Sequence, residues 1–264
     1  MKPFLIDTHC HLDMDQFLPD QDAVIQRAQA AGVEIMITIG TGSGLQGAHN
    51  AIQLAERHEC VWASVGIHPH DAGLGVDLAG LRPLAEHPKV VAIGETGLDF
   101  YRDWAPIDAQ ERTFIAQIEL ARAVKKPLII HSREAGDRCL TILKEHNASE
   151  VGGVFHCFSE NSSFAKELST MGFMVSFPGQ VTFKKAHEVR ATCLKIPLEQ
   201  ILLETDSPFL APEPHRGKRC EPAFILETAR RIALEKSISL EELGEITTNN
   251  ARTLFKSIKI PPTT

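Results

Sequence analysis

The feature that most constrains the fold of this chain is a regular alternation of short apolar runs with longer amphipathic stretches. The short runs have the length of buried strands, and the longer stretches have the periodicity of helices. The pattern predicts eight strands, at Phe4–Asp7, Val33–Ile39, Val61–Gly66, Val90–Gly94, Leu128–His131, Gly153–His156, Phe173–Ser176 and Gln200–Glu204. Helices are predicted near residues 21–31, 44–58, 78–86, 108–125, 135–146, 162–170 and 186–194, with two more near 221–236 and 240–256.

This alternation predicts an α/β protein. Strands that each precede a helix pair in parallel through right-handed crossovers, and eight of them close a (β/α)8 TIM barrel of about 250 residues. An open, doubly wound sheet is the alternative, but the first strand is not followed by a glycine-rich phosphate loop. We therefore expect one TIM-barrel domain over residues 1–264, with a frayed tail at 261–264.

Composition narrows the class of protein. The chain is 43% hydrophobic and 23% charged, as in soluble globular proteins, and it has neither an apolar run of about 18 residues nor the features of a signal peptide. We expect a cytoplasmic protein without a membrane span. Its six cysteines form no Cys-x-x-Cys pair and are expected to be reduced. The net charge of −7 argues against an extended grip on duplex DNA.

Histidines and carboxylates gather where the predicted strands end. The i, i+2 spacing of His9 and His11 at the end of the first strand places both on one face, although solvated loop histidines would look the same. Because the carboxyl ends of barrel strands meet at one rim, burying many ionisable groups there is costly unless they bind a metal. Four other strands lead into such groups, namely Glu95, His131, His156 and Asp206.

These six side chains predict a centre for two divalent ions. One ion is assigned to His9, His11, Glu95 and Asp206, and the other to Glu95, His131 and His156, so that Glu95 bridges the two. Nitrogen and oxygen ligands without thiolate suit Mg, Mn or Zn. Such a pair of ions ionises a water between them and stabilises the charge of an in-line displacement. Glu95 and Asp206 are the predicted catalytic residues, with Asp206 as the general base toward that water.

Two further carboxylates are predicted just below the metals. Asp7 lies two residues before His9, and Glu204 lies two residues before Asp206, so each pair shares one face of its strand. In that position Asp7 and Glu204 would accept the second N–H of a ligand histidine. The alternative is that both are buried polar residues tied to nearby backbone or to a lysine.

Basic residues near the same rim are predicted to contact the substrate. His68 follows the third strand, and Arg133 lies two residues beyond His131. A guanidinium group matches the geometry of phosphate oxygens, although Arg133 would also suit a surface ion pair with a neighbouring carboxylate. The loop after the eighth strand adds a local concentration of positive charge to a negative chain. Its predicted substrate contacts are His215, Arg216 and Lys218.

Several motifs that contain these residues resemble the TatD family of metal-dependent deoxyribonucleases. They are Asp7-Thr8-His9-Cys10-His11, Gly66-Ile67-His68-Pro69, Gly94-Glu95-Thr96-Gly97-Leu98-Asp99, His131-Ser132-Arg133, His156-Cys157-Phe158-Ser159, Glu204-Thr205-Asp206-Ser207-Pro208 and His215-Arg216-Gly217-Lys218. The resemblance implies a TIM barrel of the amidohydrolase superfamily with a divalent, two-metal site at the six ligand positions. It also implies hydrolysis of DNA phosphodiesters, often from the 3′ end of single strands.

The chain departs from the family's usual pattern at two positions. Cys220 stands where the family often has asparagine, and Pro178 stands where a small polar residue is more usual. Neither departure falls on a predicted ligand. We expect them to bear on substrate preference.

The leading functional hypothesis is a monomeric 3′–5′ exodeoxyribonuclease that acts on single-stranded DNA with two divalent ions. The same metal-bound water serves other reactions, and a fold does not determine a function. A hydrolase of a small ester, lactone or amide is therefore the first alternative. A metal-binding scaffold that has lost catalysis is the second, and the complete set of predicted ligands argues against it.

Overall fold

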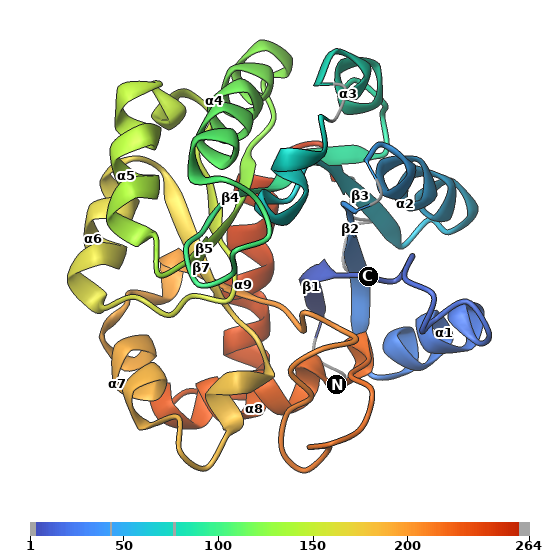
Figure 1. Cartoon of the computed structure of the whole chain (residues 1–264). Coiled ribbons are helices and arrows are strands. Elements are labelled where there is room, and N and C mark those ends of the chain that lie inside the picture. Colours follow the sequence, from blue (N-terminus) through green and yellow to red (C-terminus); the bar gives the residue numbers. More distant parts are fainter. Residues whose placement is uncertain (1–3, 43, 76–77, 259–264) are drawn as a thin grey trace.

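The structure, a computed structural model, describes residues 4–42, 44–75 and 78–258 (Figure 1). Strands and helices alternate along these residues as the sequence predicts, and the predicted tail at 261–264 lies outside them. The strands of the described part are β1 (Leu5–Cys10), β2 (Val33–Gly40), β3 (Val61–Val65), β4 (Val90–Asp99), β5 (Leu128–Arg133), β6 (Gly153–Phe155), β7 (Phe173–Phe177) and β8 (Ile201–Leu203).

Helices surround these strands in chain order, and Figure 1 shows α1 to α8 around the circumference of the ring of strands. Each predicted helix is confirmed, with ends that differ by a few residues. Their bounds are α1 (Gln21–Ala30), α2 (Gln46–Arg57), α3 (Leu78–Ala85), α4 (Ile107–Val124), α5 (Gly136–Glu145), α6 (Ser162–Thr170), α7 (His187–Lys195), α8 (Ile225–Lys236) and α9 (Leu240–Leu254). None of the helices described is long and apolar enough to cross a membrane.

The sheet closes on itself. All neighbouring strands from β1 to β8 pair in parallel in chain order. The ring is completed beyond β8, where the Asp206 amide donates to the His9 carbonyl at 2.9 Å and the His11 amide donates to the Ser207 carbonyl at 2.7 Å. The predicted (β/α)8 TIM barrel is confirmed, and the last two hydrogen bonds tie two predicted ligand segments directly together.

Apolar side chains fill the barrel from its amino-terminal end. The helix α9 covers this end, where Thr248 donates to the Phe4 carbonyl at 3.1 Å and Asn250 donates to the Ile201 carbonyl at 2.9 Å. Leu254 at the end of α9 and Phe255 directly after it pack with a buried cluster of strand residues that includes Ile6, Ile35, Ile37, Ile39, Ile129 and Leu202. A second cluster fills the space between the strands and the outer helices. The polar groups are consequently left to the opposite, carboxyl-terminal end.

The strand β4 is longer than predicted, and this difference shapes the site. An apolar-run criterion ends the strand at Gly94, whereas its pairing with β5 continues to Asp99. The register shifts between Gly94 and Thr96, so Glu95 is an extra residue at a β-bulge. Bulges re-aim a side chain next to active sites. The prediction that β4 ends at Gly94 was wrong, because backbone pairing with β5 extends the strand through polar residues that an apolar run does not include.

Candidate metal centre

The six predicted ligands come together at the carboxyl-terminal end of the barrel. They are supplied by five strands or by the residues that directly follow them, and the barrel closure described above makes the first and last strands neighbours. Each side chain is buried or half-buried. The six residues are His9, His11, Glu95, His131, His156 and Asp206.

Glu95 lies at the middle of this group. One of its oxygens, Oε1, is 2.7 Å from His156 Nε2 and 2.9 Å from His131 Nδ1. The other, Oε2, is 3.5 Å from His9 Nε2. A carboxylate that faces histidines on two sides through its two different oxygens has the arrangement required of a bridging ligand.

The other carboxylate faces the histidines of the first strand. Asp206 Oδ1 lies 3.4 Å from His11 Nε2 and 3.7 Å from His9 Nε2. The rings of His9 and His156 stack with their centroids 3.9 Å apart. The potential ligand atoms of His9, Glu95 and His156 lie within 4.8 Å of one another, as do those of His9, His11 and Asp206. The predicted ligands therefore form one continuous cluster, in which His9 belongs to both groups and Glu95 connects them to His131.

The hydrogen bonding of His9 tests whether the cluster fits a metal. Its side chain is buried, yet neither ring nitrogen has a hydrogen-bond partner within the described part of the chain. Leaving a buried polar atom unpaired costs about 1–3 kcal/mol. A cation ligated by His9 Nε2 would satisfy that atom, and the nitrogen and carboxylate donors around it suit a divalent ion. The residues present fit the metal.

The protonation states also suit a metal site. Burial, together with repulsion from His156, lowers the pKa of His9 to about 4, so this imidazole is neutral and free to ligate. Burial opposes ionisation of Glu95 and Asp206, but the surrounding histidines hold the pKa of both carboxyls below its usual range. Burial is likewise outweighed at His131, where Asp99 and Glu95 raise the pKa to about 9. A cation ligated by His131 would have to displace this proton.

A cavity of about 380 Å³ opens beside this cluster and offers room for a substrate. Predicted ligands form part of its wall, and Arg133 and Phe209 border it. Its lining residues are His131, Ser132, Arg133, His156, Cys157, Ser159, Gln180, Asp206, Phe209 and Leu210.

Comparison with known proteins places this geometry in a family. The model of TatD-related DNases matches residues 6–256. The chain belongs to the TatD-related DNase family. It is 43% identical over 254 residues to the uncharacterized metal-dependent hydrolase YabD of Bacillus subtilis (strain 168), covering 96% of this chain and 99% of the relative. It is 37% identical over 254 residues to the 3′-5′ ssDNA/RNA exonuclease TatD of Rahnella sp. (strain Y9602), covering 93% and 95%.

A solved structure agrees with this assignment. The crystal structure of YjjV, a TatD homologue from Escherichia coli K12, superposes with a TM-score of 0.90 at 31% identity, covering 99% of this chain and 100% of that one. The resemblance drawn from the motifs is thereby confirmed. The chain is a TatD-family metal-dependent hydrolase, and its His, Asp and Glu clusters are able to bind metal.

Two of the predicted substrate contacts of this TatD-family chain lie at the centre. His68 Nε2 is 3.4 Å from Glu95 Oε1 and 3.3 Å from His131 Nδ1, so this ring is in direct contact with two predicted ligands. Arg133 lines the cavity, and its guanidinium lies 3.7 Å from the centroid of the Tyr101 ring. The alternative for Arg133, a surface ion pair, is not among the contacts of the described residues.

In the basic loop after β8, two of the three predicted substrate contacts pack on aromatic rings. The ring of His215 stacks on Phe224 at 3.9 Å, and the guanidinium of Arg216 lies 3.8 Å from the centroid of Phe183. Lys218 is exposed. Of these three residues, none lines the cavity beside the predicted ligands. Aromatic packing directs the His215 and Arg216 side chains, and a sequence-based argument from loop position alone does not anticipate it.

The two carboxylates predicted below the metals divide in their roles. Asp7 accepts hydrogen bonds from the Thr205 amide at 2.9 Å, the Thr205 hydroxyl at 2.6 Å and the His9 amide at 3.3 Å. The prediction that Asp7 accepts a ring N–H was therefore wrong, because register shifts in β1 between Asp7 and Cys10 break the strict alternation of side chains. Burial raises the pKa of Asp7 to about 8 against these hydrogen bonds.

Glu204 lies beside a predicted ligand, but the predicted hydrogen bond from the ring of His156 is not formed within the described part of the chain. Its Oε1 is 3.8 Å from His156 Nδ1 and accepts the Cys157 amide at 2.6 Å, while Oε2 accepts the Ser176 hydroxyl at 2.5 Å. Burial raises the pKa of Glu204 to about 7. The carboxylate thus holds the turn that carries His156. Within that turn Cys157 has φ 49° and lines the cavity, whereas strict alternation from His156 places it on the far side.

Asp99 and His70 are the site residues that sequence reasoning missed. Asp99 Oδ2 lies 3.0 Å from His131 Nε2 and 2.8 Å from His70 Nε2, and the ligand atoms of His68, His70 and His131 form a further close group. A signal was present, because Asp99 follows Glu95 by four residues and shares its face in an extended strand. It was overlooked because β4 was expected to end at Gly94.

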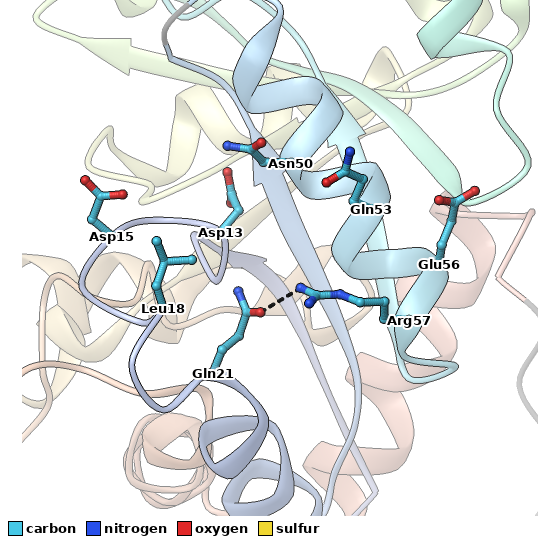
Figure 2. A pocket seen from close by; sticks show the side chains of 8 residues that line it. All are labelled: Asp13, Asp15, Leu18, Gln21, Asn50, Gln53, Glu56 and Arg57. Carbon is cyan, nitrogen blue, oxygen red and sulfur yellow. Dashed lines mark hydrogen bonds between the residues drawn. The ribbon is translucent and has the colours of Figure 1, made fainter.

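A larger hollow lies away from these residues. It has a volume of about 560 Å³ and is bordered by the loop after β1 and by α2 (Figure 2). Its lining residues are Asp13, Asp15, Leu18, Gln21, Asn50, Gln53, Glu56 and Arg57. Figure 2 shows the hydrogen bond of 2.9 Å in which Arg57 donates to Gln21. The hollow shares no residue with the predicted centre and contains no histidine.

Proposed function

We propose that this chain hydrolyses phosphodiester bonds of single-stranded DNA from the 3′ end, with two divalent ions held by the six clustered ligands. The observation that carries the proposal is the position of Glu95, whose two oxygens face histidines on both sides beside an open cavity. The name of the Rahnella relative, a 3′-5′ ssDNA/RNA exonuclease, supports the substrate and the polarity. A local site rather than a basic surface is consistent with a net charge of −7.

The bound ions would supply an activated water and would neutralise charge on the phosphate. The residues of the chain have separate tasks around that chemistry. Asp206, held ionised beside His11, accepts the proton of the attacking water. Arg133 at the cavity wall holds a phosphate oxygen. The oxygen of the water forms a bond to phosphorus, the bond from phosphorus to the 3′ oxygen breaks, and the 3′ oxygen takes up a proton from solvent. A 5′-mononucleotide therefore leaves and the shortened strand keeps a 3′ hydroxyl.

The decisive experiment is hydrolysis of a 5′-labelled single-stranded oligonucleotide by metal-stripped protein. Mg, Mn and Zn are added back separately, and metal uptake is measured in parallel. We expect a ladder that shortens from the 3′ end only when metal is restored. No cleavage with any metal, in protein that has taken up the metal, would reject the nuclease proposal and favour a small ester, lactone or amide as substrate.

Two variants connect that activity to the cluster. Glu95→Gln removes the negative charge between the histidines and is expected to reduce hydrolysis by at least about 100-fold, as is typical when a charged group essential to the transition state is lost. Glu59→Gln, at an exposed position in the turn before β3, makes the same chemical change away from the site and is its matched control. Equal activity of the two variants would refute the assignment of Glu95.

We also propose that the enzyme acts as a monomer in the cytoplasm. The large exposed apolar side chains of the described residues include Leu18, Leu74, Leu194 and Leu234, which lie on four different elements or loops. All six cysteines are free thiols, as expected in a reducing compartment. Light scattering after size-exclusion chromatography tests the first statement, since a mass of twice 29.1 kDa would contradict it.

A further inference from the structure

The distribution of aromatic side chains over the surface is uneven. Among the described residues, the exposed large aromatic side chains are Tyr101, Trp104 and Phe209, with exposed fractions of 52%, 64% and 46%. Tyr101 and Trp104 lie in the loop between β4 and α4, and Phe209 lies in the segment after β8. The strand β4 carries the predicted ligand Glu95, and the segment after β8 that holds Phe209 also holds the predicted ligand Asp206. Exposing such rings to water is unfavourable. Their concentration at one rim therefore indicates that a ligand covers them when it binds.

Contacts connect Tyr101 and Trp104 to the metal centre. The ring of Trp104 meets the ring of His70 edge to face, with centroids 4.4 Å apart. His70 in turn contacts Asp99, whose carboxylate accepts the backbone N–H of Tyr101 at 3.0 Å. The same carboxylate contacts His131. The buried Asp99 thus holds the aromatic loop and a predicted ligand in one arrangement.

Guanidinium groups lie on these rings. The Cζ of Arg133, which lines the cavity, is 3.7 Å from the centroid of Tyr101. The Cζ of Arg102 is 5.2 Å from the centroid of Tyr101 and 5.3 Å from that of Trp104. Ion pairs of either arginine are not found among the described residues, although the exposed carboxylate of Asp103 is a neighbour in sequence. Both cations therefore remain available to an anion.

The geometry points to a base-stacking platform, made of Tyr101, Trp104, Arg102 and Arg133, that binds nucleotides of the single strand next to the one being cleaved. Exposed aromatic faces with interleaved cations are how single-stranded nucleic acid is bound without regard to sequence, because every base has a π-face. The arginines reach the phosphates and the rings take the bases. This inference rests on the proposed function, and it assigns to the enzyme a preference for substrates with unpaired bases.

Fluorescence provides a direct test, because the chain has two tryptophans. Trp62 is buried, with Lys89 over its ring, whereas Trp104 is exposed. Titration of the metal-loaded protein with a phosphorothioate thymidine octamer, which resists hydrolysis, is expected to quench the emission. An octamer of the same backbone with abasic residues is expected not to quench it, and Trp104→Phe is expected to remove the quenched component.

Kinetics on hydrolysable oligonucleotides give an independent readout. Tyr101→Ala and Trp104→Ala are each expected to raise KM for a base-containing strand by about 5- to 150-fold, which corresponds to the loss of one stacked base. The KM for an abasic strand is expected to be the same in both variants and in the unaltered enzyme, and Trp104→Phe is expected to restore most of the affinity. Leu234→Ala, at an exposed apolar position on α8, is the control.

The outcomes separate this inference from the proposed function. If the enzyme degrades DNA but Tyr101→Ala and Trp104→Ala leave KM unchanged and no quenching occurs, the platform is refuted and the nuclease proposal stands. The same result is expected if the rings serve a protein partner instead. If the metal-loaded enzyme degrades no DNA, the proposed function fails, and absence of quenching by the base-containing octamer then refutes the platform as well.

Discussion

Replacing Asp99 by asparagine tests how the chain positions its metal ligands. The Asp99 carboxylate contacts the His131 ring at 3.0 Å and the His70 ring at 2.8 Å through Oδ2, while Oδ1 accepts the N–H groups of Tyr101 and Arg102. Asparagine keeps the size of the side chain, and its oxygen can continue to accept from the backbone. Its NH2 group would then face His131, where an acceptor is now present. The imidazole loses the partner that sets its tautomer and orientation.

The expected loss of metal affinity follows from the contact between the Asp99 carboxylate and the His131 ring. Removing the carboxylate partner of a ligand histidine typically lowers metal affinity by about 10- to 100-fold, which corresponds to about 1.4–2.7 kcal/mol. Metal binding is measured by titration against a chelator of known affinity, and circular dichroism verifies that the variant is folded. Asp103→Asn, which makes the same change at an exposed position of the same loop, is expected to bind metal normally. A folded Asp99→Asn variant with unaltered metal affinity would refute the role of Asp99 in orienting the His131 ring.

Three further predictions concern stability. Metal-free protein is expected to lose stability from pH 7 to 9. In the folded state His131 (pKa about 9) and Asp7 (pKa about 8) keep protons that their unfolded forms have already released, so raising the pH favours the unfolded state. A thermal midpoint that rises from pH 7 to 9 would contradict this prediction. Phe255→Ala is expected to lower the free energy of unfolding by about 3–5 kcal/mol, because the ring is fully buried where the end of α9 covers the barrel. Urea titration measures this free energy. If it falls no more than in Leu234→Ala, an exposed control, the end of α9 is not part of the core. Gln117→Leu is expected to lower the free energy of unfolding by about 1–3 kcal/mol for each polar group left unpaired. It is also expected to raise KM, because the Gln117 side chain hydrogen-bonds the backbone N–H and carbonyl of Ile67, the residue before His68. An unchanged KM would show that these hydrogen bonds do not position His68.

Several parts of the site followed from residue patterns because they depend on topology. The predicted ligands lie at or near strand ends, and parallel strands in a closed barrel must bring those ends to one rim. That reasoning needs neither loop conformations nor rotamers. It succeeded for Glu95 even though the end of β4 was misplaced, because a bulged residue at the rim still points to the centre.

Where the argument relied on strict alternation it failed, and where it relied on loop position it did not identify the packing partners. Asp7 turned out to bind Thr205, a residue 198 positions away in the chain, because β1 does not hold its register. His215 and Arg216 were predicted to contact the substrate, which stays a prediction, but their packing on aromatic rings was not foreseen. Such partners are chosen by packing between segments that are distant in sequence, and a pattern within one segment carries no information about them.

The sequence by itself therefore determined the barrel, the identity of the clustered histidines and carboxylates, and the family to which they belong, since strand periodicity and chain order suffice for these. Only the tertiary structure decided that Asp99 holds His131 and the loop of Tyr101 together, that Glu95 lies at a β-bulge and faces the histidines with two different oxygens, and that Arg133 lines the cavity. The physical reason is that hydrogen bonds and ring contacts depend on angstrom-scale distances, which are set by barrel register, bulges and loop packing and not by spacing along the chain.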